Sequence, residues 1–439
     1  MSVQKIGVGT DERTGIVYIC GEVIRRARRW FHGSGQKGVS GMRPTTILLT
    51  AALVGMAAHP VQASSLTTAF EAACDRTPEI QMLSARRAEI EARTNAAGAL
   101  LPGGPWATVT HRTDAITNDR GTREYNAEFT VPVWLRGERG ASLAAALTGR
   151  ERLEAEIAAK RLDVAKRIRD AFWMVAEARD KVAIAERRFA TATTLVQALR
   201  RQGQSGQSEL MDVKLASADA RDAEAALAGR RAELQQAAIA FQVLTGGPPP
   251  AAFREREVGK AVPTDHPRVV LRRRAAEKAV ADQELVFTQD RERPEFGGFV
   301  SNARDTSAEP NITSLGVRLK VPFAYDAINQ PKRAAAAAEV VGAREEAALA
   351  EREVAGDAAQ AQARLVGARQ QRAALDARHG DLASVVQLTE QGQRSGQAVL
   401  TDLIRARLQL YEADLSRAVA RIAVERARSD LNQALGLEP

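Results

Sequence analysis

The sequence predicts a mainly α-helical protein with a small β part, built as an internal duplication. Aromatic residues make up only 4% of the chain, and alanine, arginine, leucine and glutamate dominate, which is typical of long helices rather than a thick globular core. Landmarks of one half return 190 residues later, as in Pro132 and Pro322, Asp212 and Asp402, and Gly246 and Gly436. This period is too long for a solenoid, so each half is read as one complete structural repeat.

The N-terminal region has the pattern of an export signal. Residues 42–63 combine a short basic start, an apolar run and small residues before a cleavage point, as in a secretory signal peptide. A buried core helix is the alternative for this run. Residues 1–41 show no apolar period and are expected to be a non-native or disordered N-terminal extension. The two structural repeats are then expected at 64–250 and 251–439.

Charge and reactive residues exclude several classes of function. The net charge is +8, but residues 1–63 carry eight Lys and Arg against three Asp and Glu, so nucleic acid has no support as a partner. Cys74 is the only cysteine after the predicted cleavage point, which excludes an intrachain disulfide. The histidines are isolated, and no phosphate-binding loop or nucleophile motif occurs. We therefore predict no enzyme activity, no cofactor and no bound metal.

Each half is expected to begin with a helical stretch that leads into two strands. The helical stretches are predicted at Leu66–Leu100 and Pro267–Arg291, where prolines follow. The strands are predicted, in chain order, near Trp106–Asp114, Tyr125–Val133, Phe296–Asp305 and Leu315–Val321. Polar loops join the two members of each pair.

The second strand of each pair alternates between apolar and polar residues. Apolar side chains of Tyr125–Val133 and Leu315–Val321 occupy every second position, so one face of each strand is apolar and the other polar. This pattern suits a half-buried sheet, and it also suits a membrane β-barrel with lipid on the apolar side. Open edges are excluded from lipid and the smallest barrels have about eight strands. A barrel would therefore be shared, with eight strands from two chains or twelve from three.

A long helical hairpin follows each strand pair. Helices are predicted from Glu138 to about Gln202 and from about Lys332 to Gln391, each roughly 90–100 Å long at 1.5 Å per residue. Apolar seams at spacings of four and three are predicted from Val164 to Phe189 and from Ile404 to Ile422. Glycine-rich turns lead to return helices that are expected to end at Gly246 and Gly436. A soluble coiled-coil spacer would explain these helices, but neither the strands nor the export signal.

Three segments resemble a known family over residues 66–437. The two turn segments read SGQSELMDV (205–213) and SGQAVLTDL (395–403), and the second strand-to-helix connection reads VPFAYDAINQPKRAAAAAE (321–339). Together with the duplicated element order, the turns resemble the TolC family of outer-membrane efflux proteins. The third segment resembles the CzcC-like, heavy-metal branch of that family.

The resemblance implies a homotrimer in the outer membrane of a Gram-negative bacterium. Its twelve strands would form one shared transmembrane β-barrel in outer-membrane lipid, and its helical hairpins would form an α-barrel tunnel across the periplasm. The protein would be a passive duct for substrates delivered by an inner-membrane pump of the RND type through a periplasmic adaptor (membrane fusion) protein. A periplasmic coiled-coil adaptor or scaffold protein is the alternative function.

The resemblance also assigns roles to individual residues. The periplasmic tip or gate would contain Asp212, Asp402 and Arg405. The tip turns that contact the adaptor would be Ser205, Gly206, Gln207, Ser395, Gly396 and Gln397. The strand-to-helix transitions would lie at Pro132 and Pro322. Arg405 stands where the family archetype has a second aspartate, and Ala398 where it has an arginine, so the paired acidic ring is not reproduced. The alternative for Asp212 and Asp402 is that they cap the return helices, where a carboxylate suits the positive N-terminal end of the helix dipole.

Overall fold

The computed structural model describes residues 65–204, 210–258, 265–395 and 397–439, all within one unit of the chain, residues 61–439. The predicted extension and signal peptide, the turn residues Ser205, Gly206 and Gln207, and Gly396 lie outside the described residues. In the described part, no helix combines the length and hydropathy needed to cross a membrane.

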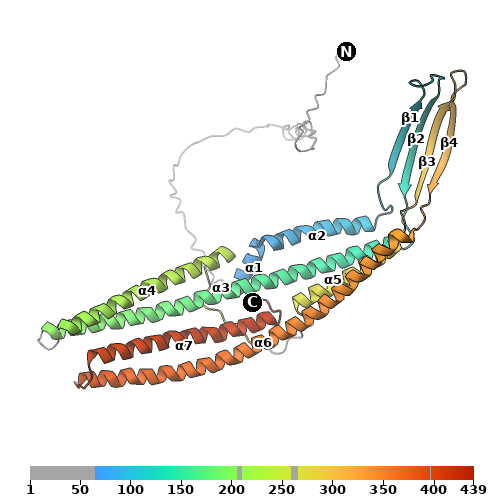
Figure 1. The fold of residues 1–439 in the computed structure, drawn as a ribbon. Helices are drawn as coiled ribbons and strands as arrows, with labels where there is room; N and C mark the ends of the chain where they lie inside the picture. Colours follow the sequence, from blue (N-terminus) through green and yellow to red (C-terminus); the bar gives the residue numbers. More distant parts are fainter. Residues whose placement is uncertain (1–64, 205–209, 259–264, 396) are drawn as a thin grey trace, which may run out of the picture. The chain divides into compact units, whose positions relative to one another are not determined.

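The elements repeat the predicted order in the two halves (Figure 1). The first half contains α1 (Leu66–Arg76), α2 (Pro78–Ala97), β1 (Trp106–Thr113), β2 (Arg123–Pro132), α3 (Glu138–Gln204) and α4 (Leu210–Thr245). The second half contains α5 (Pro267–Thr288), β3 (Glu295–Arg304), β4 (Ile312–Lys320), α6 (Asp326–Arg394) and α7 (Leu400–Ala434). The mainly α fold with a small β part is thus confirmed.

Two predicted helix boundaries are wrong, both next to prolines. The stretch Leu66–Leu100 is two helices, because Thr77 is extended (ψ 114°) immediately before Pro78. The second long helix begins at Asp326, six residues before the predicted Lys332, and it contains Pro331. Pro331 is the sixth residue of this helix, so its ring removes one backbone hydrogen bond and crowds the carbonyl of Ala327.

Predicted glycine caps end both return helices. Gly246 has φ 78° and Gly436 has φ 80°, a left-handed conformation that only glycine adopts without strain. The Gly246 amide donates to the carbonyl of Gln242 at 2.7 Å, and the amide of Leu437 donates to the carbonyl of Asn432 at 3.0 Å. These caps stop α4 and α7 at corresponding points of the two repeats.

The four strands form one antiparallel sheet in the order β1-β2-β3-β4. Strand β2 pairs with β3 in a register that places Ala127 opposite Val300 and Phe129 opposite Gly298. The two hairpins of the two repeats are therefore joined side by side, and β1 and β4 remain as the sheet edges.

The helices lie side by side in a row of four, as the strands do (Figure 1). Nearer the sheet, the helices that contact one another follow the order α2-α3-α5-α6, and farther from it the order is α4-α3-α7-α6. Helices α3 and α6 run through both levels. In the described ranges, neither α2 nor α4 contacts α6. The unit is therefore an open strip, with β1, α2 and α4 along one edge and β4 and α6 along the other.

The first predicted seam is correct and the second is correct only at its ends. On α3, the predicted seam positions from Val164 to Ala185 are buried and Phe189 is half-buried. On α7, Ile404 is half-buried and Ile422 is buried, but Leu408 is 40% exposed, and the middle of the buried row is formed by Ala406, Ala413 and Ala420 instead. The small alanines let α7 lie close to its neighbours, whereas the larger side chains predicted for the seam lie beside them. Tyr411, for example, stacks under the guanidinium of Arg188 on α3.

Candidate functional site

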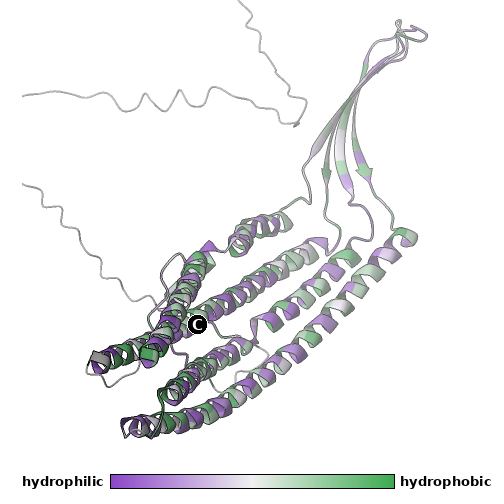
Figure 2. Ribbon diagram, turned by 60° about the vertical axis from the view of Figure 1, so that its left-hand side comes forward, coloured by the Kyte–Doolittle hydropathy of each residue, from purple (hydrophilic) through white to green (hydrophobic). Residues whose placement is uncertain are grey.

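One face of the sheet is apolar and uncovered. The strand registers place three rows of apolar side chains and one glycine on this face: Val131, Phe296 and Leu319; Phe129, Gly298 and Val317; and Ala127, Val300 and Leu315. Leu315 is 81% exposed and Val317 is 78% exposed. In the described part of the chain, no helix contacts the sheet. Figure 2 shows the green, hydrophobic residues interspersed along the strands.

The opposite face of the sheet carries paired charges. Arg318 on β4 contacts the carboxylate of Glu128 on β2 at 2.6 Å, although β3 lies between their strands. Thr130 also donates to Glu128 at 3.2 Å, and the Glu128 side chain is only 7% exposed. Near the helices, Lys320 contacts Glu295 at 3.3 Å. The sheet is therefore two-sided, with an apolar face and a polar face of balanced charge.

Both predicted transition prolines line one open hollow between the sheet and the helices. Pro132 ends β2, and Pro322 follows β4 by two residues. Both belong to the wall of a hollow of about 900 Å³, which also includes the exposed side chains of Phe323 and Tyr325. The two strand-to-helix connections thus meet at one place.

A buried carboxylate organises this junction. Glu138, the first residue of α3, is fully buried and contacts Arg293 at 2.8 Å. It also accepts hydrogen bonds from Gln289 at 2.9 Å and from the backbone amide of Leu135 at 3.1 Å. Burial alone would raise the pKa of Glu138, but the hydrogen bonds from Arg293, Gln289 and Leu135 hold the pKa below its ordinary value. Its counterpart in the second repeat is Ile328, which is exposed. The repeated sequence pattern therefore does not single out Glu138.

The predicted tip residues lie at the start of the return helices. Asp212 and Asp402 are both in the first helical turn, and neither is the N-cap residue of its helix. Asp402 is exposed and lies 3.7 Å from Arg405 on the next turn. Both carboxylates therefore lie where a negative charge suits the helix dipole.

The described part of the second turn is organised by one carbonyl. The Gly392 carbonyl accepts hydrogen bonds from the amide of Gln397 at 2.8 Å, the amide of Ala398 at 3.2 Å and the hydroxyl of Ser395 at 3.0 Å. Leu400 then packs against Val196, Leu199 and Ala216 of the first hairpin. Leu400 is 6% exposed whereas its counterpart Leu210 is 75% exposed. The two tips are therefore unequal in packing as well as in charge.

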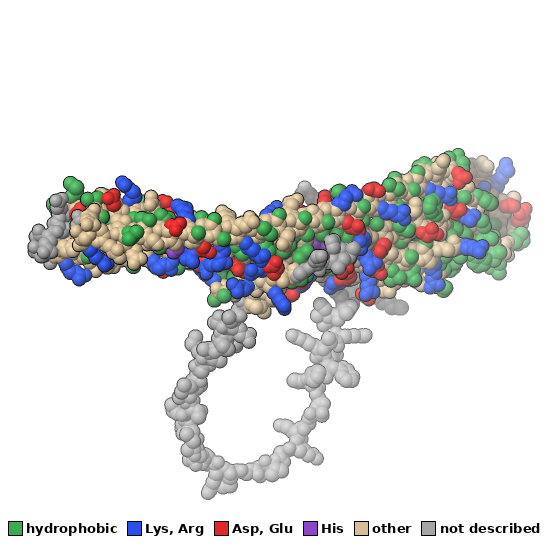
Figure 3. Space-filling model, turned by 90° about the horizontal axis from the view of Figure 1, so that it is seen from below, with side chains coloured by type: hydrophobic (Ala, Val, Ile, Leu, Met, Phe, Trp, Pro, Cys, Tyr) green, Lys and Arg blue, Asp and Glu red, His purple; other side chains and the backbone are tan. Residues whose placement is uncertain are grey.

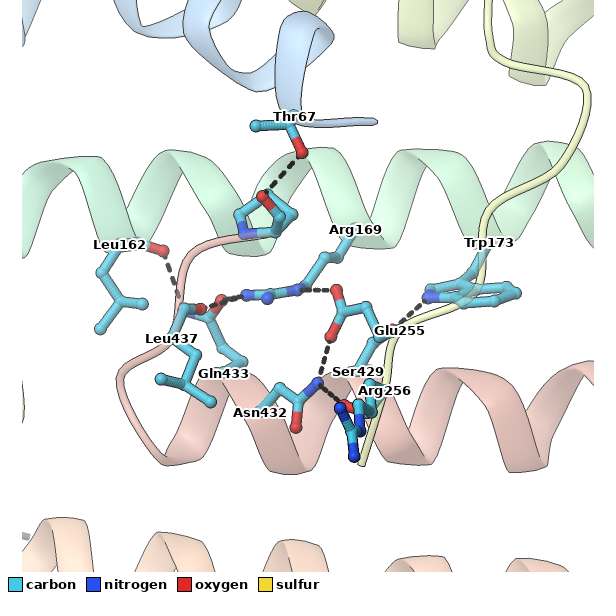
Figure 4. A network of polar contacts seen from close by, with 11 residues as sticks. Thr67, Leu162, Arg169, Trp173, Glu255, Arg256, Ser429, Asn432, Gln433 and Leu437 are labelled. Carbon is cyan, nitrogen blue, oxygen red and sulfur yellow. Dashed lines mark hydrogen bonds and ion pairs between the residues drawn. The ribbon is translucent and has the colours of Figure 1, made fainter. Parts of the chain in front are cut away.

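A buried polar network joins the repeats midway along α3 (Figure 4). Arg169 on α3 contacts Glu255 of the inter-repeat connection at 2.6 Å, and Glu255 accepts a hydrogen bond from Asn432 on α7 at 2.7 Å. Arg169 also donates to Gln433 and to the carbonyl of Leu437. The sequence gives no signal for this network, because the partners of Arg169 lie up to 268 residues away along the chain and follow no motif.

Outside the sheet, positively and negatively charged side chains are distributed along the helices (Figure 3). Hydrophobic side chains are denser toward the end of the molecule that carries the sheet. The described residues contain no group of three or more His, Cys, Asp or Glu that could hold a metal ion. His379 and Asp414 form an isolated pair at 3.0 Å.

Comparison with known proteins identifies the same architecture. A family model for outer membrane efflux proteins matches residues 70–247. The cobalt-zinc-cadmium resistance protein CzcC of Cupriavidus metallidurans is 28% identical over 232 residues, which are 49% of this chain. The chain spans only 56% of that relative's length.

Solved structures match over more of the chain. The CusC structure, described in terms of transmembrane channel formation, is 16% identical with a TM-score of 0.71, covering 85% of this chain and 92% of CusC. The open-state MtrE outer membrane channel of Neisseria gonorrhoeae is 17% identical with a TM-score of 0.68, covering 84% of this chain and 88% of MtrE. The chain therefore matches the outer membrane efflux protein family by sequence over residues 70–247, and it shares the fold of these solved channel structures over most of its length.

Proposed function

We propose that this protein is the outer-membrane channel of a tripartite efflux system. Three copies would form a passive duct that spans the outer membrane and extends far into the periplasm. An inner-membrane pump of the RND type would deliver substrates through a periplasmic adaptor protein. The family match and the CusC-like fold support this proposal.

The main support for a ring of copies is that both edges of the described sheet are unpaired. Strands β1 and β4 are exposed along almost their whole length, and their outer backbone groups would need partners in lipid. Pairing β1 of one copy with β4 of the next is a head-to-tail contact, and such contacts generate a ring when the rotation from copy to copy closes. Because each chain supplies four strands, three copies give twelve, within the range of outer-membrane barrels.

The two faces of the sheet fit the two sides of such a barrel. The apolar rows around Val317 would face lipid, and the paired charges of Glu128 and Arg318 would face the aqueous interior. The 67 residues of α3 correspond to roughly 100 Å of helix, enough to carry the tunnel well beyond the membrane.

Detergent extraction and electrophysiology test this function together. We expect the protein in the outer-membrane fraction, as a trimer in native mass spectrometry, with stable conductance in planar bilayers. Recovery as a soluble periplasmic monomer without channel activity would support the coiled-coil adaptor or scaffold function instead.

The tip of the second repeat is the proposed gate. Three copies of Asp402 around a narrow axis would repel one another, and each neighbouring Arg405, 3.7 Å away, would partly offset that repulsion. If this charge pattern sets the gate, Asp402→Ala should change single-channel conductance by about twofold or more, whereas Asp381→Ala, an exposed change earlier on α6, should leave it unchanged. Unchanged conductance in Asp402→Ala would leave only the helix-dipole role for this carboxylate.

Divalent metal cations are the proposed substrate class. The support is the match to a cobalt-zinc-cadmium resistance protein. A deletion strain should then become more sensitive to zinc, cadmium and cobalt, and the gene should restore resistance. Sensitivity confined to organic drugs would contradict this assignment while leaving the channel function intact.

A further inference from the structure

The apolar face of the sheet ends in two further rows at the loop end, away from the helices. The first row contains His111, Tyr125, Asn302 and Thr313, which are cross-strand neighbours from β1 to β4. The second row contains Thr113, Arg123 and Arg304. Along the strands, the face therefore changes from apolar to amphipathic and then to cationic.

The cationic row consists of two like charges placed directly opposite each other. Arg123 on β2 and Arg304 on β3 are partners in the register, so their Cβ atoms are about 5 Å apart. Like charges in such a pair destabilise a sheet. In the described part of the chain, neither guanidinium forms an ion pair with a carboxylate. On the opposite face of the same end, by contrast, Arg112 lies 3.7 Å from Glu124.

Arg304 is held in a defined orientation. Its Nε donates a hydrogen bond to the carbonyl of Gly121 at 3.0 Å, which leaves the terminal nitrogens of the guanidinium available. Gly121 has φ 93°, and a Cβ there would lie 2.7 Å from the amide of Ser307 in the second hairpin loop. Since the two loops are joined by hydrogen bonds at Arg120–Ser307 and Thr122–Asp305, the arginine pair is backed by a packed loop cluster.

The amphipathic row beneath is equally ordered. The rings of His111 and Tyr125 are stacked with centroids 4.4 Å apart, and the Asn302 amide donates to the Thr313 hydroxyl at 2.9 Å. Tyrosine and histidine combine an apolar ring with a polar tip, which suits the boundary between acyl chains and headgroups. From the row of Val131 to the row of Arg123 the strand rises about 26 Å along its own axis, which a barrel tilt of about 35–45° reduces to roughly 19–22 Å of membrane height, comparable with the apolar band of outer-membrane barrels.

We propose that Arg123 and Arg304 together bind a phosphate group of the phosphorylated glycolipid, lipid A, in the outer leaflet. This inference rests on the proposed function, because that function puts the apolar face in lipid and the loop end at the outer leaflet. Guanidinium groups bind phosphate through paired, charge-assisted hydrogen bonds, and a phosphate between them would offset the Arg–Arg repulsion. Each copy in the ring would carry one such site.

Lipid titration of the detergent-solubilised trimer tests the site. Bound lipid per chain would be measured by native mass spectrometry with diphosphoryl lipid A and, separately, with phosphatidylglycerol. We expect the double variant Arg123→Gln/Arg304→Gln to bind lipid A roughly tenfold more weakly, the effect of losing about 1.4 kcal/mol of charge-assisted hydrogen bonding. Arg112→Gln, at the same end but on the opposite face, should bind like the unaltered protein. Arg123→Lys/Arg304→Lys keeps both charges and should retain more binding than the glutamine variant.

Several results would overturn the inference. Equal lipid A binding by the folded glutamine variant and the unaltered protein would show that the arginines do not form a site. Equally tight binding of phosphatidylglycerol by the unaltered protein would contradict the assignment to lipid A. If the unaltered protein conducts in bilayers yet shows no arginine-dependent binding, only this inference fails. If it neither inserts nor conducts, the proposed function fails with it.

Discussion

At the scale of single residues, Glu138 is the buried charge on which the sheet–helix junction depends. Glu138→Gln removes the negative charge beside Arg293 and replaces an acceptor-only carboxylate by an amide. We expect the free energy of unfolding to fall by about 1–3 kcal/mol, the usual cost of an unpaired buried hydrogen-bonding group. Glu353→Gln, an exposed change on α6, is the matched control and should alter stability by less than about 0.5 kcal/mol. Equal effects of the two changes in urea unfolding would contradict the role of Glu138.

His266 should make stability depend on pH. His266 is buried at the start of α5, and its Nδ1 accepts a hydrogen bond from the amide of Arg268 at 3.1 Å. Burial and then the charge of Arg268 lower the pKa of His266, while Asp357 and a backbone hydrogen bond to Gln433 act in the opposite direction. The unfolded chain therefore binds the proton more readily, so the stabilisation is complete above about pH 6.5 and is lost as pH falls below that value.

The variant His266→Asn isolates this effect. Asparagine is a good N-cap that does not titrate, so the cap persists at all pH values. Between about pH 7.5 and pH 5.5, the free energy of unfolding should fall less in the variant than in the unaltered protein. Parallel pH profiles from urea unfolding would show that His266 does not contribute.

At the scale of elements, strand β4 is the best probe of the sheet's environment. Val317 is 78% exposed at the centre of the apolar rows, and Val317→Arg should cost about 2–4 kcal/mol if this face meets lipid near the midplane. Ser314→Arg places the same side chain on the opposite, polar face of the same strand. We expect outer-membrane trimer to decrease for Val317→Arg only. Equal trimer levels for the two variants would show that this face is not in lipid.

Most elements follow from local sequence, whereas some boundaries do not. Alternation along Leu315–Val321 and the absence of proline from Glu138 to Gln202 predict strand and helix correctly. The predicted start of α6 at Lys332 is too late because the helix continues through Pro331, which costs it one backbone hydrogen bond. The α7 seam is mispredicted at its centre because large apolar side chains such as Leu408 do not form it. Buried alanines such as Ala413 and Ala420 form it instead, and their small side chains allow close helix packing.

At the scale of the whole molecule, the Arg169–Glu255 pair joins the two repeats. The side chains are only 3% and 6% exposed. Removing one partner leaves the other charge buried, so Arg169→Met and Glu255→Gln should each lower the free energy of unfolding by about 3–5 kcal/mol. The double variant should cost much less than the sum, because no lone charge remains. Arg230→Met, which breaks the exposed pair with Glu233, should cost at most about 1 kcal/mol. Additive effects of Arg169→Met and Glu255→Gln would contradict direct coupling.

The sequence by itself determined the duplication, the element types, the apolar strand face and the family resemblance. These properties depend on spacing along the chain, since period-two and heptad patterns, glycine caps and repeated prolines are local signals. The tertiary structure alone decided the side-by-side order of the helices and strands, the buried partners of Glu138 and Arg169, and the pairing of Arg123 with Arg304 across β2 and β3. Arg169 and Glu255 are 86 positions apart in the chain, and Arg123 and Arg304 are 181 positions apart. Only helix packing and strand register bring such distant residues together.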